Sequence, residues 1–438
     1  MAATAGRSGR VEAVRAGGGD AAPSDRVAAG QGGAIRRGTL LLVSQVYVPD
    51  PASVGQHLHG AAAEMVRRGW RVVVLTSARG YDDPSRRYPA RELLDGVEVR
   101  RLPLSSFGKR SIAVRVAAQA LFLLQAVARG LFVRGVTRVL VSTSPPTAAV
   151  AGVALGALHR APLAYWVMDL NPDQVVALGR MAPGSLPVRA LDWLNRRALG
   201  FARDVVVLDP YMARRVCAKR DVRDKIAVLP PWPHDGHLAP VAHADNPFRA
   251  RHGLEGRFVV AFSGNMSIAS PLTTFLQAAL RLSAHPRLTF LFVGGGLGRR
   301  EVEQAIARAR PPNVVLLPYQ PLSELALSLS AADVHVVTLG DAMVGVVHPC
   351  KVYGAMAVGR PVLYFGPAPS HVADLLAEGG FGWRVANGDV DGAEALLRRL
   401  AELPAAELAA RGEAGRRLVA QRLSEAALCG ALCDVLER

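Results

Sequence analysis

The chain has few cysteines and few aromatic residues, and its acids are outnumbered by its bases. The four cysteines, Cys217, Cys350, Cys429 and Cys433, form no CxxC pair and no disulfide framework. This excludes a disulfide-stabilised scaffold and favours a reducing compartment. The sequence also lacks zinc-ligand spacing, an RNA-binding signature and interleaved aromatic and basic residues. We therefore expect no nucleic-acid partner.

The first 37 residues lack both an apolar period and the continuous apolar core of a signal peptide. They are rich in glycine and alanine, with six arginines against three acids. Such a composition cannot bury enough surface to order itself. We expect residues 1–37 to be a disordered tail and the protein to be cytoplasmic.

The remaining composition is that of a large, basic α/β protein. The chain has 438 residues, of which 50% are hydrophobic, and a formal net charge of +16. This length favours two domains of roughly 180–200 residues each. The charge indicates an anionic partner, such as phospholipid headgroups or a phosphorylated ligand.

Apolar runs alternate with helical stretches in two series, which predicts two doubly wound domains with parallel sheets. The Pro-rich stretch Leu229–Pro240 interrupts both series and is the linker candidate. The first series has runs at 39–44, 71–76, 137–142, 163–168 and 204–208, and the second at 258–262, 288–293, 313–317, 333–338 and 362–365.

In such sheets ligands bind beyond the carboxyl ends of the strands. In the first series, Gly55 precedes a helix and is either a ligand contact or a turn glycine. Asp169 in MDLNPD either meets a sugar hydroxyl or caps a short helix. In the second series the expected strand ends carry small or backbone-exposing residues: Gly264, Asn265, the glycines at 294–296, and Tyr319.

The stretch GVVHPCKVYGAMAVGRPVLYFG, residues 345–366, predicts a loop, a short helix and a buried strand. Pro349 suits a first helical turn, and Gly359 suits the helix end. Lys351 would then lie at the N-terminus of the helix. There the free backbone N–H groups and the lysine ammonium would together favour binding of a phosphate or diphosphate. The alternative is an ordinary crossover helix with a solvated lysine.

With these motifs in order, the chain resembles the GT-B glycosyltransferases, and within them family 4 of the retaining enzymes, in its bacterial surface-polysaccharide branch. The matching segments span roughly residues 39–435. They are YVPDPASVGQHLHGAAAEMVRRGWRVVVLT, MDLNP, FSGNM, LFVGGG, NVVLLPYQP and PCKVYGAMAVGRPV.

The resemblance implies two Rossmann-like domains with a deep cleft between them. The acceptor-side domain would consist of residues 38–228 together with a C-terminal helix at about 415–438. The nucleotide-sugar domain would span 229–414. The catalytic residues would be Asp169 and Lys351. The donor would contact Gly55, Gly264, Asn265, Gly295, Tyr319, Val346 and Lys351.

The implied activity is a retaining sugar transfer, of the hexosyl transferase class, without metal or other cofactor. One departure concerns Gly354, where many family members have a glutamate that binds the ribose. A sugar-nucleotide 2-epimerase and a non-catalytic glycosyltransferase-like subunit remain as alternatives. Asp389 and Asp391 spell DxD, but they precede a helix, where capping is the expected role.

The apolar stretch 111–133 concerns the acceptor, which is expected to be lipid-linked or delivered by a membrane. Its polar residues Arg115, Gln119, Gln125 and Arg129 fall within an arc of about 120° on a helical wheel. Two arginines argue against a spanning helix. The segment is either a buried helix or one lying in the membrane interface. We expect residues 109–134 to hold the protein peripherally on the cytoplasmic face of the inner membrane.

Overall fold

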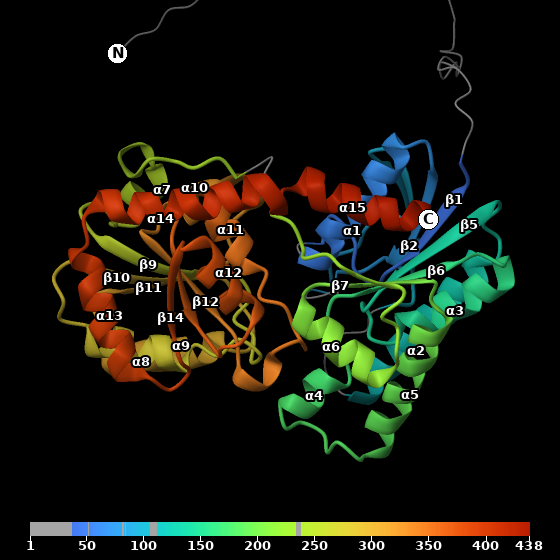
Figure 1. Cartoon of the computed structure of the whole chain (residues 1–438), viewed down its shortest axis with the longest axis horizontal. Coiled ribbons are helices and arrows are strands. Elements are labelled where there is room, and N and C mark those ends of the chain that lie inside the picture. Colours follow the sequence, from blue (N-terminus) through green and yellow to red (C-terminus); the bar gives the residue numbers. More distant parts are fainter. Residues whose placement is uncertain (1–36, 51, 81–82, 84, 106–111, 234–237) are drawn as a thin grey trace, which may run out of the picture. The chain divides into compact units, whose positions relative to one another are not determined.

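The structure is a computed structural model that describes residues 37–438, apart from residues 51, 81–82, 84, 106–111 and 234–237. The expected tail lies outside the described residues except for Arg37, whose guanidinium pairs with Glu437 at 2.8 Å. The described chain contains two sheets with helices on both faces (Figure 1).

The first sheet has eight strands in the order β3-β4-β2-β1-β5-β6-β7-β8. All neighbouring strands are parallel except β3, which runs antiparallel to β4 at the edge. Central strands such as β1, with sequence TLLLV, are wholly buried because helices cover both faces. The strands are β1 Thr39–Val43, β2 Arg71–Ser77, β3 Arg91–Leu94, β4 Val97–Leu102, β5 Val136–Ser142, β6 Leu163–Val167, β7 Asp204–Val207 and β8 Ile226–Val228.

The second sheet has six parallel strands in the order β11-β10-β9-β12-β13-β14. The order reverses beside β9, which is the topological switch point at which open α/β sheets bind ligands. The strands are β9 Phe258–Ser263, β10 Leu288–Val293, β11 Val314–Leu317, β12 Val334–Thr338, β13 Val362–Phe365 and β14 Gly382–Val385.

Helices α2, α3 and α5 form one layer on the first sheet, and α1 packs with the C-terminal helix α15 (Figure 1). Arg68, which follows α1, pairs with Asp434 and Glu437 of α15. The helices between the strands of this sheet are α1 Ser53–Arg67, α2 Ile112–Gly130, α3 Ala148–His159, α4 Asp173–Ala177, α5 Leu186–Phe201 and α6 Pro210–Lys219.

The second sheet is covered by α8, α9 and α13 on one face, while α11 packs with α14 (Figure 1). The α-helices here are α7 Pro247–Arg251, α8 Thr273–Arg281, α9 Arg299–Ala309, α10 Leu325–Ser330, α11 Lys351–Ala357, α12 His371–Gly379, α13 Val390–Glu402, α14 Ala405–Leu418 and α15 Glu425–Glu437. Shorter turns are η2 His243–Asp245, η3 Leu322–Glu324, η4 Asp341–Met343 and η5 Val419–Leu423.

The two parallel α/β sheets confirm the predicted fold class. The domain boundaries stay predictions. Every helix in the described ranges is too short or too polar to cross a membrane.

Candidate functional site

Most of the expected donor residues lie at one edge of the six-stranded sheet, where its strands end. Gly264 and Asn265 follow β9, the glycines at 294–296 follow β10, and Tyr319 stands two residues beyond β11. Lys351 is the first residue of α11, on the connection between β12 and β13. At this edge of an open α/β sheet, loop backbone can converge on a ligand.

The Lys351 side chain lies against the backbone of Gly264. A Cβ built on Gly264 would be 2.8 Å from Lys351 Cε, and the φ of Gly264 is +127°, so both space and conformation require glycine there. The ammonium nitrogen lies 5.2 Å from the centroid of the Phe262 ring. Burial lowers the pKa of Lys351, and no carboxylate in the described part of the chain pairs with it. A half-buried, unpaired ammonium is a suitable receptor for an anion.

The glycine run after β10 packs tightly on the neighbouring loops. A Cβ at Gly295 would lie 2.9 Å from Tyr319 Cε2, and one at Gly296 would collide with Asn265 Oδ1. The carbonyl of Gly295 accepts a hydrogen bond from Met266 N–H at 2.7 Å. Side chains here would therefore push apart the loops that surround Lys351.

Asp169 follows β6 and lies beside the loop that precedes Lys351. The N–H groups of Met168 and Asp169 donate to Thr143 Oγ1 at 3.2 and 3.1 Å. Leu170 N–H donates to the carbonyl of Val346 at 2.8 Å. Burial raises the pKa of Asp169 to about 6, although the nearby His348 opposes the shift.

Cys350 shows that Asp169 and Lys351 lie close together. Burial raises the pKa of its thiol to about 12, and both Lys351 and Asp169 act on it electrostatically. The two expected catalytic residues, one a cation and one a carboxylate, therefore both lie near Cys350.

Two of the expected donor-binding residues, Val346 and Gly55, make close contacts within the protein. Val346 is fully buried, its N–H donates to the carbonyl of Met343 at 2.9 Å, and its carbonyl accepts from Leu170 N–H. A Cβ at Gly55 would lie 3.0 Å from Tyr47 Cα, so glycine here lets α1 pack against the loop after β1. No hydrogen bond in the described ranges joins Gly55 to Lys351. The donor role of both residues stays a prediction.

The helix that carries Lys351 is shorter than expected. It begins at Lys351 itself, two residues after Pro349, and ends with Val358 as its C-cap. Gly359 then adopts a φ of +64°, as predicted for a glycine that terminates a helix. Because α11 has seven residues, its dipole contributes little, and the Lys351 charge matters more.

A cluster of polar side chains next to this site was not predicted. His348 contacts Asp209 through Nδ1 and Tyr353 through Nε2, each at 2.8 Å. Tyr353 Oη in turn lies 3.0 Å from His371 Nε2. Local sequence gives no signal for this cluster, because Asp209 stands 139 residues from His348.

The DxD aspartates serve structural roles. Asp389 caps α13 by accepting a hydrogen bond from Gly392 N–H at 2.9 Å, which confirms the expected capping. Asp391 pairs with Arg281. In the described ranges no group of histidines, cysteines and acids is arranged to hold a metal ion.

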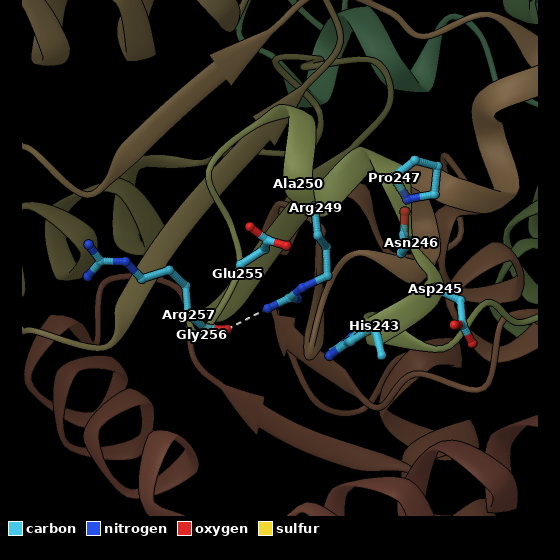
Figure 2. Close-up of a pocket in the computed structure, with 10 residues that line it drawn as sticks. His243, Asp245, Asn246, Pro247, Arg249, Ala250, Glu255, Gly256 and Arg257 are labelled. Atoms are coloured by element: carbon cyan, nitrogen blue, oxygen red, sulfur yellow. Dashed lines mark hydrogen bonds between the residues drawn. The ribbon is translucent and has the colours of Figure 1, made fainter.

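A hollow of about 620 Å³ lies elsewhere, between η2, α7 and the start of β9 (Figure 2). Arg249 lies within it, and its guanidinium donates to the carbonyls of Ala331, Leu254 and Arg257. The lining of this hollow includes Arg257, which directly precedes β9 and is thus at the opposite end of that strand from Gly264. It is therefore separate from the candidate site.

The comparisons with known proteins agree with this geometry. A family model described as a glycosyl transferase 4-like domain matches residues 53–232, and one for glycosyl transferases group 1 matches residues 257–403. The HepE protein of Anabaena, solved in complex with UDP-glucose, superposes with a TM-score of 0.69 at 15% identity, over 91% of this chain and 99% of that one.

Two curated bacterial proteins are similar in sequence. The probable glycosyltransferase WbjE of Pseudomonas aeruginosa is 26% identical over 268 residues, which is 59% of this chain and 65% of WbjE. The putative colanic acid biosynthesis glycosyl transferase WcaI of Escherichia coli is 24% identical over 225 residues, 50% of this chain and 55% of WcaI. The match thus spans less than two thirds of either relative.

The two parallel sheets and the strand-edge site define a protein of the GT-B class. The two family models together match about three quarters of the residues. The chain belongs to family 4 of the GT-B glycosyltransferases.

Proposed function

We propose that the protein is a retaining glycosyltransferase of surface polysaccharide or glycolipid biosynthesis. It moves a sugar from a nucleotide-sugar donor to a lipid-linked or membrane-delivered acceptor, at the cytoplasmic face of the inner membrane. The observation that carries the proposal is the unpaired Lys351 ammonium packed on Gly264, with Asp169 beside the same segment. The family models, and the names of WbjE and WcaI, support the reaction class.

In this proposal Lys351 binds the donor diphosphate together with backbone N–H groups of the loops at Gly264 and Gly295. The diphosphate gains negative charge as it leaves, so a fixed cation stabilises the transition state more than the ground state. Asp169 faces the sugars, where a carboxylate can accept a hydrogen bond or a proton from a hydroxyl.

Product analysis with radiolabelled donors tests the function. Purified protein is incubated with bacterial membranes as acceptor source and, in turn, UDP-glucose, UDP-galactose, UDP-N-acetylglucosamine and GDP-mannose. Transfer of label to lipid or polysaccharide supports the proposal. An isomerised sugar nucleotide would instead identify a 2-epimerase, and an unchanged donor would identify a non-catalytic subunit. The last alternative remains because Gly354 lacks the side chain that many family members use to bind the ribose. The backbone does not itself require glycine there, since a Cβ would lie 3.5 Å from Leu329 Cδ1, an ordinary contact.

Chelation should leave the transfer rate largely unchanged, because the Lys351 ammonium supplies the positive charge for the leaving diphosphate. The double variant Asp389→Asn with Asp391→Asn should also remain active, since asparagine can still cap α13. The measurement is the initial rate with and without EDTA. Complete loss on chelation, restored by magnesium or manganese, would overturn the metal-free mechanism.

The membrane proposal rests on the orientation of α2. Its buried face is formed by Ala118, Phe122 and Ala126. The glutamines point the same way: the Gln125 amide donates to the carbonyl of Leu104 at 2.7 Å, and Gln119 lies 3.5 Å from Thr147 Oγ1. These two glutamines therefore lie on the protein side of the helix, whereas Arg129 is exposed.

The outward side of α2 is apolar. Val116 and Leu124 are 61% and 67% exposed, and Phe132, just beyond the helix, is 82% exposed. No aspartate or glutamate occurs between Glu98 and Asp169, whereas nine arginines and lysines do. An exposed apolar helix in a basic, acid-free stretch fits the surface of an anionic bilayer. Lys109 and Arg110 lie outside the described residues.

The triple change Val116→Ser, Leu124→Ser and Phe132→Ser should release the protein from vesicles of phosphatidylglycerol and phosphatidylethanolamine. Each exposed side chain loses about 1.5–3 kcal/mol of burial in the interface, so binding should fall by at least about tenfold per residue. High salt should also weaken wild-type binding. Vesicle flotation measures both effects.

Leu93→Ser is the matched control, because Leu93 is 68% exposed but lies on the edge strand β3. It should float with the vesicles as wild type does. The triple variant should keep the wild-type melting temperature, since none of its three side chains is in the core. A folded triple variant that still floats would contradict the membrane contact.

A further inference from the structure

Two arginines face each other just beyond the end of β2. Arg79, which is half-buried, and Arg87, which is exposed, form an isolated antiparallel bridge. The residues that flank the bridge are joined by backbone hydrogen bonds of 3.0 and 3.1 Å, one on each side. The arginines are thus a pair without backbone hydrogen bonds of its own, the kind in which side chains approach most closely. Like charges placed directly opposite in this way repel and destabilise the pair.

Elsewhere the chain supplies an acid where two arginines oppose each other. Arg91 on β3 faces Arg100 on β4, and Glu98 pairs with Arg100 at 2.8 Å. Arg79 and Arg87 have no such partner, because neither guanidinium forms an ion pair or a hydrogen bond within the described residues. A bound anion would remove their repulsion and gain two charge-assisted contacts.

The backbone is fixed on both sides of the pair. Arg79 N–H donates to Oγ of Ser77, the last residue of β2, at 3.0 Å. Beyond Arg87, the carbonyl of Ala90 accepts a hydrogen bond from the N–H of Arg101 on β4 at 2.8 Å. Side chains on a fixed backbone lose less conformational freedom when they bind a ligand.

The pair lies at the edge of the first sheet where ligands bind in open α/β sheets. It follows the carboxyl end of β2, and β6 at the same edge ends two residues before Asp169. Only β1 and β5 separate β2 from β6 in the sheet, so the two strand ends are about 14 Å apart. This separation leaves room for sugar between an anion on the arginines and a hydroxyl at Asp169.

The pair also adjoins the segment that leads into α2. Ala78 N–H donates to the carbonyl of Leu102, the last residue of β4, at 3.0 Å. Ser77 Oγ lies 2.7 Å from Ser105 Oγ, and α2 begins at Ile112. The arginine pair and the first turn of α2 therefore lie at the same edge of the sheet. This position suits an anion presented by the bilayer that α2 is proposed to contact.

We propose that Arg79 and Arg87 bind the diphosphate of a lipid-linked acceptor, with one guanidinium on each phosphate. Two facing cations match a doubly charged linkage better than the single charge of a phospholipid headgroup. Arginine binds phosphate through paired N–H groups, so two arginines also fix the direction in which the acceptor sugar extends. The acceptor role rests on the proposed function, whereas binding of a diphosphate to the pair does not.

Vesicle binding measures the site without any donor. Phosphatidylcholine vesicles are prepared with either diacylglycerol diphosphate or phosphatidylglycerol, at equal surface charge. Wild type should prefer the diphosphate vesicles. The double change Arg79→Gln with Arg87→Gln should reduce the ratio of the two affinities by about tenfold or more, because two charge-assisted contacts to phosphate are lost. The general loss of two charges lowers both affinities alike and cancels from the ratio.

Arg287→Gln with Arg308→Gln is the matched control. It removes the same charge at exposed positions, before β10 and in the last turn of α9. The affinity ratio of this variant should equal that of wild type. Lys351 is present in all three proteins, so diphosphate bound there cancels from the comparison. An equal loss on both kinds of vesicle in the double variant of Arg79 and Arg87 would indicate contact with bulk headgroups. That result, or an unchanged ratio, overturns the diphosphate site.

Thermal unfolding separates a binding role from a structural one. The two arginines repel each other in the ligand-free protein, so Arg79→Gln and Arg87→Gln should each leave the melting temperature unchanged or slightly raised. A lower melting temperature in either ligand-free variant would show that the arginines stabilise the segment, and it too overturns the site.

The transfer assay measures the acceptor role. The double variant should raise KM for the membrane acceptor by about tenfold or more, with kcat and the donor KM unchanged, because the pair lies away from the reacting atoms. A wild-type acceptor KM in this variant overturns the acceptor role. If wild type transfers no sugar, the proposed function fails while the vesicle result still decides whether the diphosphate site exists.

Discussion

Replacing Lys351 with alanine should reduce sugar transfer by roughly 10- to 150-fold, because a charge-assisted contact to phosphate contributes about 1.5–3 kcal/mol. Stability should not fall. The ammonium pairs with no carboxylate in the described ranges, and burial already lowers its pKa. The initial transfer rate and the free energy of unfolding in urea measure the two effects separately.

Lys225→Ala provides the control with the opposite pattern. The Lys225 ammonium donates to the carbonyls of Gly200 and Ala202 at 3.2 and 2.7 Å, so its loss should lower stability and leave the transfer rate unchanged. A Lys351→Ala protein with the wild-type transfer rate would show that the phosphate site is wrongly assigned.

Amine labelling offers an independent check of the same site. The chain contains only four lysines, at positions 109, 219, 225 and 351. UDP should protect Lys351 from acetylation by acetic anhydride, as read by peptide mass spectrometry. Lys219, which is bound to Asp173 and Asp192, should be modified equally with and without UDP.

The alternation of apolar runs was sufficient to predict the two parallel sheets, because strands buried on both faces must be continuously apolar. It did not predict β3, whose residues alternate between exposed and half-buried, or β4, whose first four residues alternate between buried and half-buried. The turn between them is Asp95-Gly96, with φ values of +48° and +80°, which is a hairpin signal. A search for apolar runs alone cannot find such an edge hairpin.

At the site, the strand-edge rule is sufficient to predict that Gly264, Gly295 and Tyr319 lie together. Each follows its strand within a few residues, so local sequence determines its position. The partner of His348 could not be found this way. Asp209 resembles any helix-capping residue, and only tertiary packing brings it within 2.8 Å of a histidine 139 residues away.

Asp169→Asn should lower kcat by about 10²-fold or more while making the protein more stable at neutral pH. Asparagine has nearly the same shape and can still accept a hydrogen bond, but it cannot take a proton or carry charge. In wild type, kcat should fall as the pH drops below about 6, the raised pKa of Asp169. The Asn variant should lack this acid limb, and rate profiles from pH 5 to 8 measure it.

The stability effect follows from the same shift. The folded protein holds the Asp169 proton more tightly than the unfolded chain, whose reference pKa is 3.8 against about 6 when folded. Ionisation between these values therefore costs the native state about 1–3 kcal/mol, and this cost is fully present only above about pH 6. Asp169→Asn removes this cost. The free energy of unfolding in urea should therefore increase for the variant, relative to wild type, as the pH rises from 5 to 7.5.

Asp224→Asn, at an exposed position, is the control, and its free energy of unfolding relative to wild type should not change over this pH range. A variant with undiminished kcat, or with no gain in stability over this range, would mean that the carboxylate is neither buried nor functional as proposed.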